Sequence, residues 1–502
     1  MSAVTVAEER VVVHDDPPPA RRSRLDPRSI PAWLVAGLVT GIVCLLRAGS
    51  PVPWRDELAT LIAAQRSFSE QLHMEHNLDA VFAVYYAFMH VWTEVFGISM
   101  LSLRLPSVLA MAVAGGLVAR IGQDLYDRRT GLFAGLIFAV IPAVTRYGQE
   151  IRVYAAVVAF TLLSSWLLIR AVQRPRWTRW VAYAGSVVLV GAGHIFALTV
   201  LSAHAAYVLF GFFAERKRPL LTWIRESRVP AWTASVAGGI VVIAPLAYVS
   251  MKQSGQVAWI PELNWDTGQV WHEQLFMDGA VGGLVVVLAL LAVNRKWSAT
   301  ALCLGIAVLP LLVLAVMSIA VSPLWMMRYV LFTIPGWALL AGAALARLHR
   351  VPVAAALGAL LLFSLPQQIT LRGVNGHDDI DHQAIAAIIA DHVIPGDAVM
   401  YTPRGRFREG VEYYLPADKR PDDILVSGSA VEAGRLEVPE CINAPSCVDP
   451  RVVRIWVTCY GDCLDNPAVG LHMPARSMLK NGRFHVRQSW RVYRATVTLY
   501  QR

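Results

Sequence analysis

The sequence predicts a polytopic α-helical membrane protein that carries a C-terminal α/β domain. Of its 502 residues, 56% are hydrophobic and only 16% are charged, and the mean hydropathy is +0.47. In ordinary globular domains about a quarter of the residues are charged. Apolar runs long enough to span a bilayer recur from Ile30 to Pro366. Residues 367–502 have the composition of a soluble domain, so we expect a membrane domain (30–366) followed by a soluble domain (367–502).

The net charge of +9 comes from basic residues that cluster in short loops between the apolar runs. This distribution follows the positive-inside rule, which places Lys and Arg in cytoplasmic loops, so no nucleic-acid partner is expected. Residues 1–29 are rich in proline and charge and are expected to form a disordered cytoplasmic tail. The first apolar run, 31–46, follows arginines and lacks a small-residue cleavage site, which indicates a retained signal-anchor helix.

Twelve apolar stretches are candidates for membrane helices. In chain order they are 31–46, 79–96, 103–121, 130–145, 151–171, 179–193, 195–213, 229–249, 279–293, 298–321, 329–346 and 351–366. The basic clusters between these stretches should all lie in the cytoplasm. The clusters are 126–131, 170–179, 215–228, 294–296 and 347–350. From a cytoplasmic N-terminus, this is possible only if one of the first three stretches does not cross the membrane.

The stretch 79–96 is the best candidate for a helix that lies in the membrane interface. It carries Asp79, His90, Glu94 and two tyrosines, which suit an interfacial helix. An ordinary tilted span is the alternative, but it conflicts with the basic loops. About eleven transmembrane helices remain, and residues 47–102 become one large extracytoplasmic loop. The other segments on this side are 146–152, 250–278, 322–328 and 367–502.

An acid pair, Asp56 and Glu57, follows the first apolar run in the segment "WRDELATLIAAQ". The spacing of the leucines and the isoleucine predicts a short amphipathic helix on the membrane surface. The two carboxylates could simply favour the N-terminus of this helix. Two acids beside Trp54 and Arg55 at an interface are better explained by a function, because ionisable residues bordering membrane spans are functional candidates by default.

Two more segments on the same side carry candidate residues. In "TRYGQEIRVYA", Glu150 lies between Arg146 and Arg152, where a structural salt bridge is the alternative to a functional acid. In "SPLWMMRYVLF", Arg328 and Tyr329 open a span. An arginine at a span end either extends its side chain toward water or forks onto a phosphate, and both interpretations stay open.

The remaining motifs exclude several kinds of chemistry. The histidines His73, His76, His90 and His194 are scattered without metal-ligand spacing, and only His194 is kept as a weak site candidate. A P-loop, a GxGxxG turn and a GxSxG elbow are all absent from the sequence, so a mechanism that uses a nucleotide has no support.

The cysteines divide between the two predicted domains. Cys44 and Cys303 fall in apolar stretches and are expected to be packing residues. The soluble domain contains the other four, Cys441, Cys447, Cys459 and Cys463. Four cysteines at an oxidising surface predict two disulfides, with the pairing open. A zinc site is the alternative, but the spacings in "CINAPSC" and "CYGDC" are not the two-residue spacing that zinc prefers.

The order of these features resembles that of the GT-C fold glycosyltransferases. The resemblance rests on the acid pair, the interfacial helix, and three motifs: "SLRLPSVLAMAVAG", "RRTGLFAGLIFAVIPAVTRYGQEIRVYA" and "RYVLFTIPGWALLAG". Specifically, the sequence looks like family 39-type, mannosyltransferase-like proteins of actinobacteria, which are related to protein O-mannosyltransferases and aminoarabinose transferases. The similarity covers about 50–350. Relatives often carry His-Pro-Pro where this chain has "HNLDAV" (76–81), and this departure weakens what the resemblance implies about the donor and the acceptor.

The resemblance implies a multi-pass enzyme of the bacterial plasma membrane. It would transfer a sugar, mannose by family, from a polyprenyl-phosphate donor to a cell-envelope glycan, lipid or protein, with inversion, on the extracytoplasmic side and in contact with membrane lipids. Asp56 would be the base, Glu57 would assist it, and Glu150 matches the second acid of the family. The implied donor-phosphate ligands are Arg146, Arg152, Arg328 and Tyr329, and further possible site residues are Arg55, His76, Asp79 and His194. A divalent metal, if one is used, would bind Asp56, Glu57 and Glu150, and no other cofactor is expected.

Three alternatives stay open. The sugar could be arabinofuranose or aminoarabinose, because nothing in the sequence identifies it. A transporter or flippase of lipid-linked glycans would place charges at mid-membrane and show internal repeats, whereas the acids here cluster at one surface. A non-catalytic scaffold whose outer domain binds cell-wall polymer is the third alternative.

We expect a reporter fusion at Arg128 or Arg216 to give a cytoplasmic signal. Fusions at Asp266 and after Arg502 should give extracytoplasmic signals, because only this arrangement keeps the basic loops inside. Paired phosphatase and fluorescent-protein fusions measure the two sides independently. A cytoplasmic signal after Arg502 would mean that 79–96 crosses the membrane.

Overall fold

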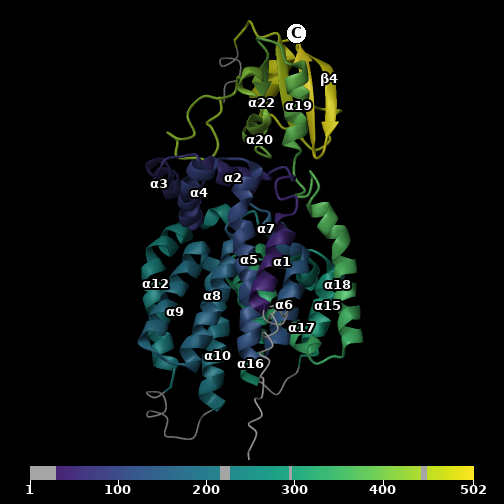
Figure 1. Ribbon diagram of the computed structural model, residues 1–502. Coiled ribbons are helices and arrows are strands. Elements are labelled where there is room, and N and C mark those ends of the chain that lie inside the picture. The colour runs from purple at the N-terminus through teal and green to yellow at the C-terminus, as the bar shows by residue number, and fades with distance from the viewer. Residues whose placement is uncertain (1–29, 215–226, 293–296, 442–448) are drawn as a thin grey trace, which may run out of the picture. The chain divides into compact units, whose positions relative to one another are not determined.

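The computed structural model describes residues 30–214, 227–292, 297–441 and 449–502 (Figure 1). The predicted tail 1–29, most of the basic cluster 215–228, the cluster 294–296 and Cys447 lie outside these residues. Residues 32–502 form one compact unit, which is mostly helical and contains a five-stranded sheet near the C-terminus. The predicted fold class, apolar helices with a C-terminal α/β domain, is confirmed.

Six helical segments of the described chain are long and apolar enough to cross a membrane. They are α5 (Met100–Leu125), α8 (Tyr154–Gln173), α12 (Val229–Lys252), α16 (Trp297–Ala320), η4 (Met327–Thr333) with α17 (Ile334–Leu345), and α18 (Arg350–Leu371). A seventh span results if α6 (Arg128–Val140) and α7 (Pro142–Gly148), which meet at 66°, count as one. Other helices of this part are α1 (Ala32–Leu45), α9 (Trp177–Gly193), η2 (Ile195–Thr199), α10 (Val200–Ala214) and α15 (Gly279–Leu290). The predicted number of about eleven spans agrees only roughly with this set.

A proline produces the bend between α6 and α7. Ile141 has an extended conformation (φ −63°, ψ 126°), as residues before proline prefer, and Pro142 opens α7. Proline is tolerated at the first helical position because its missing N–H would have no helical partner there. The turn after α7 then reaches α2 (Arg55–Ala64), where the backbone N of Ile151 donates to Glu57 at 2.9 Å.

Glycines allow the central helices to approach one another closely. A Cβ on Gly115 of α5 would lie 2.2 Å from Oγ1 of Thr40 on α1. A Cβ on Gly342 of α17 would lie 2.6 Å from the backbone N of Ala134 on α6. Small residues at such crossings let van der Waals packing hold helices together where lipid provides no hydrophobic driving force. This close packing restricts the movement of the helices, and therefore of the connections at their ends.

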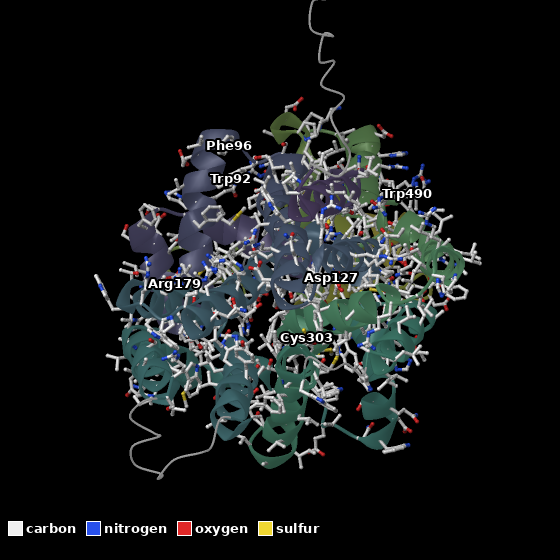
Figure 2. All side chains as sticks on the ribbon, turned by 60° about the horizontal axis from the view of Figure 1, so that its bottom comes forward. Trp92, Phe96, Asp127, Arg179, Cys303 and Trp490 are labelled. Carbon is white, nitrogen blue, oxygen red and sulfur yellow. A yellow bond between two sulfur atoms is a disulfide. The ribbon has the colours of Figure 1, made fainter. Side chains whose placement is uncertain are left out.

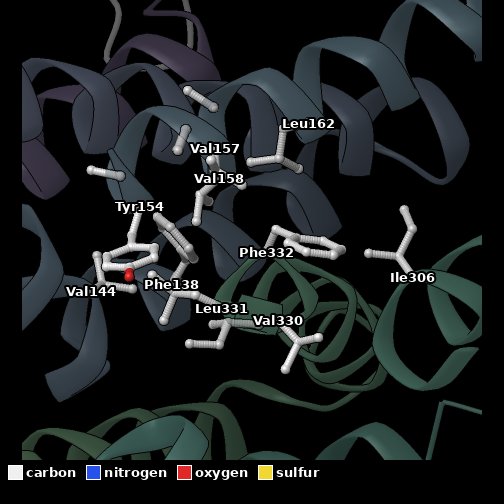
Figure 3. Close-up of a cluster of buried hydrophobic side chains, with 14 of the residues drawn as sticks. Phe138, Val144, Tyr154, Val157, Val158, Leu162, Ile306, Val330, Leu331 and Phe332 are labelled. Carbon is white, nitrogen blue, oxygen red and sulfur yellow. The ribbon is translucent and has the colours of Figure 1, made fainter. Parts of the chain in front are cut away.

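A buried apolar cluster joins α6, α8 and η4 (Figure 3). It combines Phe138 of α6, Tyr154 and Val158 of α8, and Leu331 and Phe332 of η4, which are all at most 3% exposed. Each of these side chains makes many van der Waals contacts, which are individually small and large in sum. The cluster therefore fixes where α8 and η4 begin.

Four short helices form a layer at one end of the long helices, where Figure 1 labels α2, α3 and α4. They are α2, α3 (Phe68–Asn77), η1 (Ala80–Phe82) and α4 (Ala83–Phe96). On α4, the exposed side chains Val84, Phe88, Val91 and Val95 form one stripe at helical spacing, as in a helix that rests on lipid. Trp92 and Phe96, labelled in Figure 2, contact each other with ring centroids 4.2 Å apart. The interfacial position of 79–96 stays a prediction.

The segment between α12 and α15 contains only short helices. These are η3 (Ser254–Val257), α13 (Trp265–Gln269) and α14 (Trp271–Phe276). Gln253, at the end of α12, accepts from the backbone N of Ala80 at 2.9 Å and donates to the carbonyl oxygen of Glu75 at 2.7 Å. The segment is thus tied to the layer of α2, α3 and α4.

The C-terminal domain is a mixed sheet with helices on both faces. Its strands are β1 (Ala398–Met400), β2 (Asp422–Asp423), β3 (Arg454–Tyr460), β4 (His485–Val492) and β5 (Ala495–Gln501), in the order β2-β1-β3-β5-β4. β1 pairs in parallel with β2 and β3, and the remaining pairs are antiparallel. Along β3, Trp456 packs with α19 (His382–His392) and α20 (Phe407–Tyr414), whereas Ile455 and Val457 pack with α22 (Met473–Asn481). The 3-10 turn η5 (Ala417–Lys419) follows α20.

The C-terminal domain contains disulfide-bonded cysteines. Cys459 and Cys463 form a disulfide, and Cys441 is also disulfide-bonded, with a partner outside the described residues. Cys44 and Cys303 are free and buried, as expected for packing residues.

We therefore expect thiol labelling under denaturing, non-reducing conditions to modify only Cys44 and Cys303. Mass spectrometry of labelled peptides measures this directly. The control is the same experiment after reduction, which should release four further thiols. Labelling of Cys441, Cys459 or Cys463 without reduction would contradict the disulfides, and stoichiometric bound zinc would favour the alternative.

Candidate active site

The predicted site residues lie on connections that are far apart in the sequence. They are Asp56 and Glu57 on α2, Arg146 on α7, Glu150 and Arg152 in the turn between α7 and α8, and Arg328 and Tyr329 on η4. The structure brings these connections together at one end of the helices. Nη1 of Arg328, for example, donates to Oδ2 of Asp56 at 3.3 Å.

Glu57 is a fully buried acid that pairs with a fully buried arginine. Its Oε1 accepts from Nε of Arg104 at 3.0 Å, and its Oε2 accepts from Nη2 of the same residue at 2.9 Å. Nη1 of Arg104 donates to the carbonyl oxygens of Ala48 and Pro51, both at 2.8 Å. Two parallel charge-assisted bonds combine strength with a fixed geometry. This ion pair therefore fastens α2 to α5.

Two further groups complete the surroundings of Glu57. The N–H of Ile151 donates to its Oε1, and Nδ1 of His377 lies 2.7 Å from its Oε2. Burial alone would raise the pKa of Glu57, but Arg104 and His377 hold this pKa well below its usual range. Burial, assisted by the charge of Arg146, lowers the pKa of His377 to about 3. A neutral His377 therefore donates its Nδ1 proton to an ionised Glu57.

Asp56 has a different environment, although it is the neighbour of Glu57 in the sequence. Its side chain is 20% exposed and faces three guanidinium groups. Arg328 and Arg152 lie 3.3 and 3.7 Å from Oδ2, and Arg55 lies 3.8 Å from Oδ1. Among these contacts only the one with Arg328 has hydrogen-bond geometry. The carboxylate thus keeps acceptor positions open, as a general base requires.

Trp54 connects the second acid with the arginines. Its indole Nε1 donates to Oε1 of Glu150 at 2.8 Å, and its ring centroid lies 5.4 Å from Arg146 and 6.0 Å from Arg328. Both distances allow cation–π attraction. Burial raises the pKa of Glu150, although Arg146, 3.5 Å from Oε2, opposes this effect. Glu150 consequently holds a proton more readily than a solvated glutamate does.

Asp79 joins the site through a tyrosine. The hydroxyl of Tyr86 donates to Oδ2 of Asp79 at 2.9 Å and accepts from Nη1 of Arg152 at 3.1 Å. The ring of Phe82 lies 4.5 Å from the guanidinium carbon of Arg152. Arg152 is therefore positioned by η1 and α4 as well as by its own turn.

The other predicted residues lie at different distances from this cluster. His194 is buried among aromatic rings, with the centroids of Tyr329 and Phe82 5.2 and 5.8 Å from its own. The side chain of Arg55 is 51% exposed. His76 is exposed on α3 and forms no hydrogen bond or ion pair with the described site residues. The structure thus joins Asp79, His194 and Arg55 to the site and leaves His76 outside it.

Several buried polar atoms of the site have no hydrogen-bond partner within the described residues. They are Nη1 of Arg146, Nε of Arg152, Nε of Arg328 and Oε2 of Glu150. Such atoms are rare in native proteins, because each loses its bonds to water without replacement. Nη1 of Arg146 and Oε2 of Glu150 lie 3.5 Å apart, so they form an ion pair without a hydrogen bond. Cationic donors that make no hydrogen bond, together with the open carboxylate positions of Asp56, suit a ligand that carries both a phosphate and hydroxyl groups.

The acids of the site do not fit a divalent metal ion. Both oxygens of Glu57 are bonded to Arg104, and the carboxylate of Asp56 faces three arginines. A metal ion here would place a further positive charge among guanidinium groups. Groups of three or more His, Cys, Asp or Glu residues that could hold a metal ion are also absent from the described part of the chain. We therefore derive no step through a metal ion at Asp56, Glu57 and Glu150.

Three residues of the site were not predicted from the sequence. Arg104 interrupts the apolar stretch 103–121, and a charge in such a stretch is a functional candidate, so a signal existed. Trp54 directly precedes the acid pair, but nothing there predicts its bond to Glu150. His377 has no motif that connects it with Glu57, because the two residues are 320 positions apart.

Comparison with known proteins gives a consistent result. Residues 83–248 match the family described as dolichyl-phosphate-mannose-protein mannosyltransferase. The comparison with curated protein sequences gives no significant match. Among solved structures, ArnT from Cupriavidus metallidurans in the apo state is similar, with a TM-score of 0.59, 14% identity, and coverage of 93% of this chain and 97% of that chain. The same protein bound to undecaprenyl phosphate gives a TM-score of 0.57 at 13% identity, with the same coverage.

The fold and the site define a polytopic membrane protein with a polar site at one end of its helices. The likeness to ArnT shows that the chain shares the fold of that protein, a GT-C fold as the sequence motifs predicted. The matched segment 83–248 contains Arg146, Glu150 and Arg152, whereas Asp56 and Arg328 lie outside it.

Glu57→Gln is expected to destabilise the protein by about 3–5 kcal/mol, because it leaves the buried charge of Arg104 unpaired. Asp56→Asn, one residue away, is a matched control that should cost less than about 1 kcal/mol, since its ion pairs are partly exposed. Thermal unfolding of the purified variants in detergent measures both effects. Unfolding of Glu57→Gln at the wild-type temperature would show that the pair does not hold α2 on α5.

Proposed function

We propose that the protein is an inverting glycosyltransferase that uses a polyprenyl-phosphate sugar as its donor. Its acceptor is a hydroxyl group of a cell-envelope glycan, lipid or protein. The observation that carries this proposal is the meeting of Asp56 with Arg152 and Arg328, which places an open carboxylate beside cationic donors. A base and an anion-binding group are the two parts that sugar transfer from a phosphate requires.

In the proposed reaction the acceptor oxygen attacks C1 of the sugar while the bond from C1 to the phosphate oxygen breaks. Asp56 takes the proton of the acceptor hydroxyl, and the leaving polyprenyl phosphate keeps the bonding electrons. Arg146, Arg152 and Arg328 stabilise the charge that grows on the phosphate, for which they have unpartnered buried N–H groups. A single displacement inverts the configuration at C1.

The two glutamates have separate roles in this proposal. Glu57 positions Asp56, because its buried bond with Arg104 fixes the first turn of α2. Glu150 bonds to Trp54 and has a raised pKa, so it can donate a hydrogen bond to a hydroxyl or a phosphate oxygen of the substrates.

Further observations support the identity of the sugar, the carrier lipid and the cellular location. The name of the matched family supports mannose as the sugar, and the undecaprenyl phosphate bound to ArnT supports a polyprenyl carrier. The basic loops support an extracytoplasmic site in a bacterial plasma membrane. Residues 30–366 would then form the transferase domain and residues 367–502 an extracytoplasmic domain.

We expect Asp56→Asn to reduce transfer from a purified polyprenyl-phosphate mannose by roughly 10²–10⁴-fold, because the amide cannot take the acceptor proton. The donor affinity should change little, since the arginines hold the phosphate. Arg328→Ala should instead weaken donor binding as well as turnover. Radiolabelled transfer and donor titration separate these effects.

Glu94→Gln is the control, because Glu94 is an exposed acid of α4 and should not affect transfer. If Asp56→Asn folds and transfers sugar at nearly the wild-type rate, Asp56 is not the base. In that case the acid pair serves only the start of α2.

A further inference from the structure

The C-terminal domain contains a partly open polar cavity that the proposed reaction does not use. Its volume is about 150 Å³, and its walls are the end of β1, the start of α20 and the segment 437–440. A single water needs only about 10–15 Å³, so the cavity has room for a ligand with several polar groups. Tyr401 and Phe407 supply an apolar wall, and the other sides are lined by charged and hydroxyl groups.

Two of the lining side chains have polar atoms that no described residue satisfies. Oγ1 of Thr402 and Nη1 of Arg406 are buried and without a hydrogen-bond partner. Arg406 also has a left-handed backbone (φ 51°), which is unfavourable for arginine. Unsatisfied polar atoms and backbone strain both cost stability, and they persist where a site uses them.

The charges around the cavity nearly cancel. Arg408 bonds to Asp423 and, at 3.2 Å, to Glu440, so its charge is compensated. Arg406 lies 3.6 Å from Glu437. Burial raises the pKa of Glu409. A strongly anionic or cationic ligand would therefore meet a like charge, whereas a neutral ligand with many hydroxyls would find both donors and acceptors.

The cavity is attached to the layer of short helices that carries the site. The hydroxyl of Tyr413, at the far end of α20, donates to the carbonyl oxygen of Ile98 at 2.9 Å. Near the wall formed by 437–440, the carbonyl oxygen of Arg435 accepts a hydrogen bond from Nη2 of Arg66, two residues after the end of α2. The helix α20 contains eight residues, a length of about 12 Å, and it contacts α2.

We propose that this cavity binds one neutral sugar residue of the acceptor glycan. The proposal rests on the proposed transferase function, since it assigns the acceptor to the carbohydrates. Thr402 and Arg406 would satisfy their free atoms on sugar hydroxyls, and Glu409 would accept or donate a further hydrogen bond. Anchoring one acceptor residue here would hold the chain near α2 and raise its effective concentration at Asp56.

The test is saturation-transfer NMR on the full-length protein in nanodiscs. The probes are methyl α-D-mannopyranoside, methyl α-D-glucopyranoside and methyl α-D-arabinofuranoside, with inorganic phosphate as the anionic comparison. At least one glycoside is expected to bind, and Asp56→Asn should bind it equally well. Binding is measured without transfer, so a failure of the proposed reaction and a failure of this site give different results.

Two variants locate the binding site. Thr402→Val removes a hydroxyl that has no protein partner, so folding should be unaffected and glycoside binding should weaken roughly three- to tenfold. Arg406→Asn suits the left-handed backbone and should weaken binding at least about tenfold. Arg404→Asn, an exposed neighbour outside the cavity wall, is the matched control and should bind like the wild-type protein.

Three outcomes would overturn the proposal. One is the absence of glycoside binding to a folded wild-type protein. Another is binding that Thr402→Val and Arg406→Asn leave unchanged while Asp56→Asn abolishes it, which would assign the signal to the transferase site. The third is competition by phosphate, which would make the cavity an anion site.

Discussion

The buried pair of Glu57 and Arg104 is the constraint on which the arrangement of the site depends. Successive residues of an α-helix point about 100° apart, so a helix that buries Glu57 against α5 must direct Asp56 elsewhere. It directs Asp56 toward Arg152 and Arg328, where the carboxylate is still partly exposed. Two adjacent acids thereby acquire separate tasks, one as an anchor without access to solvent and one as an accessible carboxylate.

The site balances its charges only in part. Glu57 has its full complement of partners, whereas Arg146, Arg152 and Arg328 keep unpartnered N–H groups around Asp56 and Glu150. In a site of low dielectric constant such donors interact strongly with an anion, and they need no rearrangement when its charge grows. The helix ends that carry them rest on the apolar cluster of α6, α8 and η4, so the excess of donors is held in place by packing.

The sequence predicted those parts of the structure that depend on local patterns. The short surface helix predicted for the segment after Trp54 is present as α2. The placement of Asp56, Glu150 and the arginines at one end followed from the order of spans and loops. The bonds from Trp54 to Glu150 and from His377 to Glu57 could not be predicted, because they join residues about 100 or more positions apart through side-chain geometry. The number of spans was only approximate, since several helices are shorter than their apolar stretches.

Hydrogen bonds that the sequence did not predict also connect the start of the C-terminal segment 367–502 with the site. His377 follows α18 and completes the surroundings of Glu57, and the carboxylate of Asp379 accepts from the backbone N of Arg55 at 3.0 Å. Both contacts involve the first turn of α2. The start of the C-terminal segment therefore helps to set the position of Asp56, and a displacement of this segment would reach the carboxylate through only one turn of helix. A glycan held in the cavity would lie against the start of α20, a helix that itself contacts α2. Acceptor binding and base positioning would therefore be connected through the contact of α20 with α2.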